Sequence, residues 1–110
     1  MSESKAALSA AKVRVGALVK ATPALFEGFS KISKTATANG SFSAAEKELM
    51  ATAIAVVQGC EDCILYHVEG AKKHGAEETA LVEALEVAVE MGGGPAVMYA
   101  AKALDAFRAL

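Results

Sequence analysis

Residues 43–75 have the sequence SAAEKELMATAIAVVQGCEDCILYHVEGAKKHG, which predicts two consecutive helices joined at a glycine. Ser43 and Glu46 match a capping box, in which both side chains bond to backbone donors in the first helical turn. The helix that follows is expected to weaken at Gly59. A second helix is expected to run from there to Gly75, because glycine at a helix C-terminus readily adopts the left-handed conformation.

Helical periodicity also extends to both sides of this stretch. We expect helices over residues 5–20, from Pro23 to Asn39-Gly40, over residues 77–91, and after Gly92-Gly93-Gly94-Pro95. Thr22 is expected to cap the helix that begins at Pro23, which makes six helices in all. No segment alternates with period two over the length of a strand, so the predicted fold class is all-α. The expected apolar faces, in chain order, are Leu8, Ala11, Val15, Leu18 and Val19; Leu25, Phe29, Ile32 and Ala36; Leu49, Met50, Ala53, Val56 and Val57; Leu81, Leu85, Ala88 and Met91; and Val97, Met98, Ala101, Leu104 and Phe107.

Length and composition narrow the class of protein. The 110 residues suffice for a single domain, residues 1–110, and 54% of them are apolar while only 5% are aromatic. Because 11 basic residues stand against 13 acidic ones with no basic stripe, nucleic acid is not an expected partner. A membrane is not expected either, since no apolar run approaches the length of a span and the first twenty residues lack a signal peptide's apolar centre. We therefore expect a cytoplasmic protein. Several helices are apolar on more than one face, which predicts a homo-oligomer.

The two cysteines, Cys60 and Cys63, form a CxxC pair, and in the cytosol such a pair favours redox or metal chemistry over a structural bridge. At i and i+3 on a helix, the Cα atoms lie roughly 5 to 5.5 Å apart, within disulfide range. His67 follows Cys63 by four residues, so the sulfurs and the imidazole share one helix face. The helix N-terminus favours a thiolate at Cys60, whereas His67 favours one at Cys63. Local physics therefore leaves open which sulfur reacts first.

Other interpretations of these residues remain open at this point. The cysteines can be two small buried hydrophobic residues, and His67 can be a core or interface histidine. A zinc site built from Cys60, Cys63, His67 and His74 is disfavoured, because one helix presents these groups in a line whereas tetrahedral coordination usually draws on two elements. No cofactor motif is found, and neither a metal nor a cofactor is expected. Glu48 by itself suggests an exposed helix carboxylate.

The combined pattern resembles the carboxymuconolactone decarboxylase/alkylhydroperoxidase D (AhpD)-like family over a core of about residues 42–100. Its centre is a glutamate, eleven residues, a cysteine, two residues, a cysteine, three residues and a histidine, positions filled by Glu48, Cys60, Cys63 and His67. The residues that carry the resemblance are Lys47-Glu48-Leu49, Gln58-Gly59-Cys60-Glu61-Asp62-Cys63, Tyr66-His67, Ala71-Lys72-Lys73-His74-Gly75-Ala76 and Glu83-Ala84-Leu85.

The resemblance implies an AhpD-like helical fold, assembly into a homo-trimer or homo-hexamer, and thiol-dependent peroxidase activity on a hydroperoxide substrate. It further implies that Cys63 attacks the peroxide, that Cys60 resolves the sulfenic acid, and that Glu48 and His67 relay protons. A dithiol reductant protein, lipoyl or thioredoxin-like, is the partner it implies. Asp62 departs from the pattern, since better-studied peroxidases of the family often have a histidine there, and its negative charge predicts weaker turnover.

Two alternatives to a peroxidase follow from the same residues. One is a non-enzymatic oligomeric module of the same fold that senses redox state or binds a metal, which Asp62 favours. The other is a lactone-hydrolysing or decarboxylating enzyme, although by resemblance that branch of the family lacks the paired cysteines. Peroxide turnover, metal content and sensitivity to thiol alkylation separate the three possibilities.

Overall fold

The computed structural model describes residues 2–110, which form six helices and no strand. The expected all-α fold class is confirmed. The helices are α1 (Glu3–Ala21), α2 (Pro23–Thr37), α3 (Ala44–Gln58), α4 (Glu61–Lys73), α5 (Glu78–Gly92) and α6 (Gly94–Ala109).

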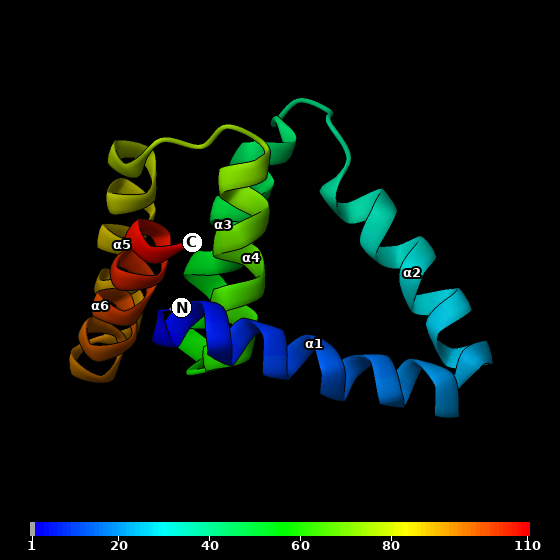
Figure 1. Cartoon of the computed structure of the whole chain (residues 1–110). Coiled ribbons are helices and arrows are strands. Elements are labelled where there is room, and N and C mark those ends of the chain that lie inside the picture. The colour runs from blue at the N-terminus through cyan, green and yellow to red at the C-terminus, as the bar shows by residue number, and fades with distance from the viewer. Residues whose placement is uncertain (1) are drawn as a thin grey trace.

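The last four helices form a bundle, and the first two extend away from it (Figure 1). Within the bundle, α3 packs on α4, α5 and α6, while α6 also packs on α4 and α5. The start of α1 lies against α4 and α6, and its second half leads outward to α2, which returns the chain to the start of α3 (Figure 1). The first two helices are thus anchored to the bundle at one end each, and α2 has no buried residue.

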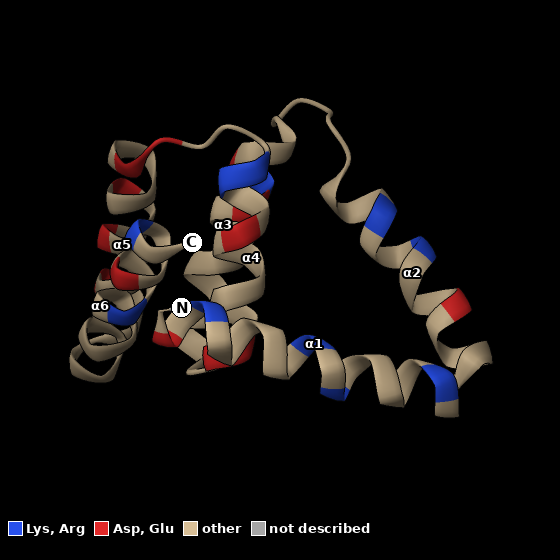
Figure 2. Cartoon of the chain, viewed as in Figure 1, with Lys and Arg blue, Asp and Glu red and all other residues tan. Residues whose placement is uncertain are grey.

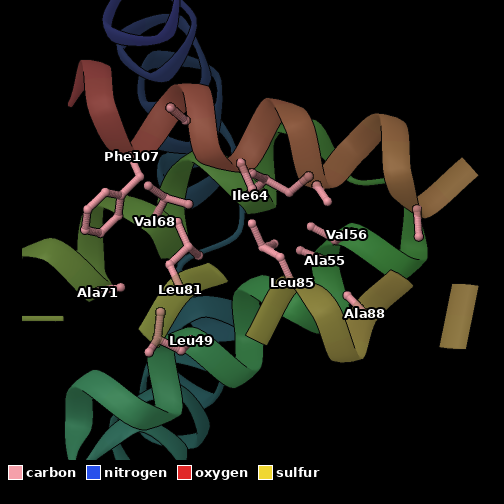
Figure 3. Packing of buried hydrophobic residues seen from close by; sticks show 14 residues of the cluster. Leu49, Ala55, Val56, Ile64, Val68, Ala71, Leu81, Leu85, Ala88 and Phe107 are labelled. Atoms are coloured by element: carbon pink, nitrogen blue, oxygen red, sulfur yellow. The ribbon is translucent and has the colours of Figure 1, made fainter. Parts of the chain in front are cut away.

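The hydrophobic core lies between the four bundle helices (Figure 3). Val56 of α3, Ile64 and Val68 of α4, and Leu81 of α5 have at most 1% of their surface exposed. Alanines form much of the remainder, and their small side chains allow α6 to approach its neighbours closely. Replacing Leu81 by alanine is expected to cost about 2–5 kcal/mol, the usual range for a core leucine.

Most helix boundaries form where the sequence predicts them. Ser43 and Glu46 make the complete capping box, Gly59 ends α3 in the left-handed conformation with φ 70°, and Gly75 follows α4 with φ 89°. Pro23 occupies the first turn of α2, where its missing N–H costs nothing. Each of these signals acts within a few residues of the boundary it sets.

Two predicted boundary contacts are wrong. Thr22 does not cap α2, because its hydroxyl donates instead to the carbonyl of Leu18 in the preceding helix. Asn39-Gly40 does not end α2 in the left-handed conformation either, since α2 stops at Thr37 and Gly40 has no positive φ. The Asn39 side chain accepts a hydrogen bond from the N–H of Ala44 and so helps to start α3.

The expected buried faces are correct only in part, both in the bundle and outside it. Of the residues predicted to be apolar contacts, those buried are Leu8, Ala11, Leu49, Val56, Leu81, Leu85, Ala88 and Phe107. The second half of α1 and all of α2 lie beyond the bundle, and on α6 alanines face the core in place of larger neighbours. The predicted contacts that are exposed are Val15, Leu18, Val19, Leu25, Phe29, Ile32, Ala36, Met50, Val57, Met91, Val97, Met98 and Ala101.

Over residues 2–110, no helix combines the length and the apolar character needed to cross a membrane.

Candidate active site

The dithiol lies at the junction of α3 and α4. Gly59 turns the chain out of α3, and Cys60, the N-cap of α4, donates its backbone N–H to the carbonyl of Ala55 at 3.0 Å. Cys60 and Cys63 form a disulfide with a Cα–Cα distance of 5.3 Å, as expected for two cysteines one helical turn apart. Both residues are partly exposed, so a reductant can reach the bridge from the surface.

The Cys60 sulfur serves as the capping group of α4. The backbone N–H of Cys63 donates to Cys60 Sγ at 3.3 Å, in the place where serine or aspartate caps other helices. The first backbone N–H groups of a helix have no acceptor within the helix, and they stabilise negative charge placed near them. This contact therefore favours a thiolate on Cys60 once the bridge is reduced.

A carboxylate–imidazole pair lies one turn further along α4. Glu48 of α3 is 7% exposed, and its Oε2 lies 3.1 Å from Nδ1 of His67. Because an ionised carboxylate only accepts, Nδ1–H must be the donor, which leaves Nε2 of a neutral ring with a free lone pair. The arrangement therefore holds His67 in the tautomer that can accept a proton at Nε2. Glu48 is therefore buried, whereas its sequence context alone suggests an exposed carboxylate.

The two acidic residues between the cysteines are each paired with a cation from another helix. Arg14 of α1 donates to Asp62 at 3.0 Å, and Lys102 of α6 donates to Glu61. The Glu61 carboxylate raises the pKa of Lys102 above its usual value. Both pairs are exposed to solvent, so each neutralises only part of the charge that the acids place near the sulfurs. Sequence reasoning missed both cations because neither lies near the motif in the chain.

The glycine before the dithiol is held against an aromatic ring. A Cβ placed on Gly59 lies 3.3 Å from two ring atoms of Tyr99, a partly buried residue of α6. With its positive φ, Gly59 therefore meets two requirements that only glycine satisfies without strain. This contact fixes the approach of the chain to Cys60.

The structure brings the four predicted site residues together as two pairs: Cys60 with Cys63, and Glu48 with His67. Within residues 2–110, His67 has no hydrogen bond to either sulfur while the disulfide is closed. Nor does that part of the chain hold a group of three or more His, Cys, Asp or Glu side chains arranged to bind a metal. The link between the pairs is the shared face of α4, on which Cys63 and His67 lie four residues apart.

Two hollows of the surface lie away from the dithiol. One of about 360 Å³ is bounded by α1, α4 and the C-terminal Leu110, and an apolar one of about 410 Å³ lies between α5 and α6. Neither is lined by a cysteine, and the dithiol is instead reached from the open surface at the α3–α4 junction. Tyr66 is 57% exposed there, and its ring meets that of His67 edge to face at a centroid distance of 5.5 Å.

Comparison with known proteins identifies relatives of this chain. The family model described as "Carboxymuconolactone decarboxylase family" matches residues 23–106. A Cupriavidus necator protein described only as uncharacterized is 50% identical over 95 residues, which cover 86% of this chain and 84% of the relative. The uncharacterized protein 4 in the cox locus of Paracoccus denitrificans is 37% identical over 94 residues, covering 86% and 85% of the two chains.

A solved structure has the same fold. The crystal structure of an apo carboxymuconolactone decarboxylase family protein from Legionella pneumophila matches with a TM-score of 0.93 and 37% sequence identity. The match covers 97% of this chain and 96% of that one, so the extended α1 and α2 are included in it.

Proposed function

Because the chain belongs to the carboxymuconolactone decarboxylase family and carries a CxxC disulfide, we propose that it is a thiol-dependent peroxidase that reduces hydroperoxides. The observation that carries the proposal is the Cys60–Cys63 bridge at a helix N-terminus, with the Glu48–His67 pair on the next turn. A dithiol, a base and a group that orients the base are the parts that such a reaction needs.

In the proposed reaction Cys63 is the first nucleophile. Nε2 of His67 takes the Cys63 proton, and the thiolate attacks the terminal oxygen of the hydroperoxide. The S–O bond forms as the O–O bond breaks, so Cys63 becomes a sulfenic acid and the substrate leaves as an alcohol once it has gained a proton. His67 is the proton donor to that leaving oxygen, and Glu48 stabilises the imidazolium in between.

Cys60 completes the oxidative half of the cycle. Its thiolate attacks the Cys63 sulfur, the S–S bond forms as the S–O bond breaks, and the sulfenic oxygen leaves as water with one proton from solvent, which replaces the proton that the Cys60 thiol gave up. The contact from the Cys63 N–H to Cys60 Sγ supports this role, because it favours the thiolate form of Cys60. The same contact makes Cys60 the better leaving group when a reductant opens the bridge at Cys63.

A dithiol reductant protein, lipoyl or thioredoxin-like, is the proposed source of the two electrons and two protons that reopen the bridge. Its first thiolate attacks Cys63 and releases the Cys60 thiolate, and its second thiol resolves the mixed disulfide. Partial exposure of both cysteines supports direct access by such a partner.

The decisive experiment follows peroxide consumption driven by a dithiol reductant, using cumene hydroperoxide with dihydrolipoamide or reduced thioredoxin. C60S and C63S should each abolish turnover, and undiminished activity in both variants would rule out the mechanism. Activity on a lactone or a β-keto acid that persists after thiol alkylation indicates the hydrolytic or decarboxylating alternative. A disulfide that cycles without turnover indicates a redox-sensing module.

We also propose that copies of the chain associate, as a homo-trimer or homo-hexamer by family likeness. Leu25, Phe29 and Ile32 of α2 are each more than half exposed, and no part of α2 is buried. Basic residues predominate along α1 and α2, whereas every charge on α5 is acidic (Figure 2). The proposed contact surface for α2 of a second copy is therefore the acidic helix α5 with the apolar hollow beside it, between α5 and α6, because the two surfaces complement each other in charge and polarity.

A further inference from the structure

Gly70 is a glycine in the interior of α4, one turn beyond His67. Such a glycine is unfavourable by about 1 kcal/mol relative to alanine, because it loses more backbone freedom on folding. At two other glycines in helix interiors, Gly16 and Gly28, a Cβ meets nothing within 4 Å, so packing does not require glycine there. Gly70 differs from them in what lies opposite.

The atoms opposite Gly70 belong to Glu48. A Cβ placed on Gly70 lies 2.9 Å from Glu48 Cδ, 3.4 Å from Cγ and nearer still to Oε2. Oε2 is also the atom that accepts the hydrogen bond from His67 Nδ1. The carboxylate oxygen that holds the imidazole therefore occupies the space that any side chain at position 70 would fill.

We propose that Gly70 is the positioning residue of the Glu48–His67 pair: its missing side chain gives the carboxylate the room in which it reaches Nδ1. The catalytic consequence rests on the proposed peroxidase function, whereas the positioning itself does not. In G70A the clash falls on the far end of a flexible side chain, not on backbone. The fold can therefore accommodate the added methyl group by turning the carboxylate away from His67.

Displacing the carboxylate changes which ring nitrogen of His67 carries the proton. With Glu48 in place, Nδ1 is the donor and Nε2 is free to take the Cys63 proton. Without it, the tautomer with the proton on Nε2 becomes populated, and that form cannot act as the base. G70A should therefore resemble removal of Glu48 while keeping the glutamate in the chain.

The test uses G70A, E48A and the double variant G70A/E48A, with G16A as the matched control, since a Cβ on Gly16 meets nothing within 4 Å. The first readout is the ¹⁵N NMR pattern of the His67 ring at a pH where the ring is neutral, assigned with the help of H74Q. Wild type and G16A should show the Nδ1–H tautomer, while G70A and E48A should both shift toward the other one. The second readout is the rate of the reduced protein's first reaction with peroxide, expected to fall about tenfold in G70A as the base is lost in part.

The double variant decides between positioning and a general structural effect. If Gly70 acts through Glu48, then G70A has no further effect on either readout in the E48A background. A wild-type ring pattern in G70A would overturn the proposal. If G70A does not fold but G70A/E48A does, the conflict with Glu48 is demonstrated directly. If neither folds, Gly70 serves helix packing and the proposal fails.

The positioning role and the proposed function can fail separately. A shifted ring pattern in a protein that never reacts with peroxide refutes the proposed function and leaves the positioning role intact.

Discussion

Arg14 of α1 donates a hydrogen bond to Asp62, one of the two residues between the cysteines, at 3.0 Å. The family resemblance leads one to expect weaker turnover from Asp62, because a carboxylate beside the sulfurs disfavours a thiolate. The cation from α1 reduces that penalty, and Lys102 does the same for Glu61 on the other side. The first and last helices thus both reach the start of α4 and moderate its charge.

Removing Arg14 should slow the reactions of the reduced dithiol. In R14Q the Asp62 charge is unopposed, so alkylation by iodoacetamide at a fixed pH is expected to slow by about two- to fivefold, the scale of an exposed ion pair. Raising the ionic strength from about 0.02 M to about 0.5 M should shrink the difference through screening. K34Q serves as control, since α2 does not pack on α4. An R14Q rate equal to that of K34Q at low salt would contradict this role.

The two single-cysteine variants should differ in their first reaction with peroxide. If Cys63 is the nucleophile, reduced C60S forms one sulfenic acid per chain, because the attacking sulfur is intact and only the resolving one is missing. C63S should form none. Trapping with dimedone followed by mass spectrometry measures both. The opposite pattern, with dimedone on C63S alone, would assign the attack to Cys60 and agree with its place at the helix N-terminus.

The helix boundaries were predictable because each depends on a local signal. The capping box of Ser43 and Glu46 and the turn at Gly59 are set by residues within a few positions of each other. The burial of long helices is not local in this sense. Val15 and Leu18 have the periodicity of a core face, but the second half of α1 has no neighbour to bury them. On α6, Ala96 and Ala100 are buried while Val97 and Met98 are exposed, a choice made by close helix packing.

The site was predictable to the extent that it lies on one helix. The shared face of Cys63 and His67 follows from their spacing of four residues. The role of Glu48 in the site is predicted only by the family pattern. The sequence of α3 alone does not show which of its carboxylates faces α4. Arg14 and Lys102 lie 48 and 41 positions from the acids they contact, and nothing in the sequence marks them.

Replacing Gly59 should destabilise the protein and disturb the dithiol. G59A places a side chain at φ 70° and within 3.3 Å of the Tyr99 ring, so a loss of about 1–3 kcal/mol in the free energy of unfolding is expected from the backbone strain and the contact. G75A is the matched comparison, because Gly75 also has a positive φ but no atom within 4 Å of its Cβ position. Urea denaturation should show the larger loss for G59A, and equal losses would mean that the Tyr99 contact contributes nothing.

Polar substitutions on α2 should weaken the proposed association. L25S and F29S remove exposed apolar surface without touching the core, so the monomer should keep its helical circular dichroism. Light scattering coupled to size exclusion should show smaller species for the double variant. S30A, an exposed change on the same helix, is the control. A monomeric wild type, or an assembly unaffected by the changes, would refute α2 as the interface.

Acid should weaken the attachment of α1 to the bundle. Lys12 of α1 lies 2.7 Å from Glu69 of α4, and this hydrogen bond, with Lys73 nearby, lowers the pKa of Glu69 below 4.5. A depressed carboxyl pKa stabilises the fold fully above the unfolded value and is lost as the pH falls through the folded one. The contribution of the pair to stability should therefore persist above pH 4.5 and be lost below that pH, and it amounts to at most about 1 kcal/mol for so exposed a pair.

Urea unfolding from about pH 6 down to about pH 3 measures this contribution. K12Q should lose stability at the upper pH and show a shallower acid dependence. An acid dependence equal to that of the wild type would mean that the Lys12–Glu69 pair does not hold α1 in place.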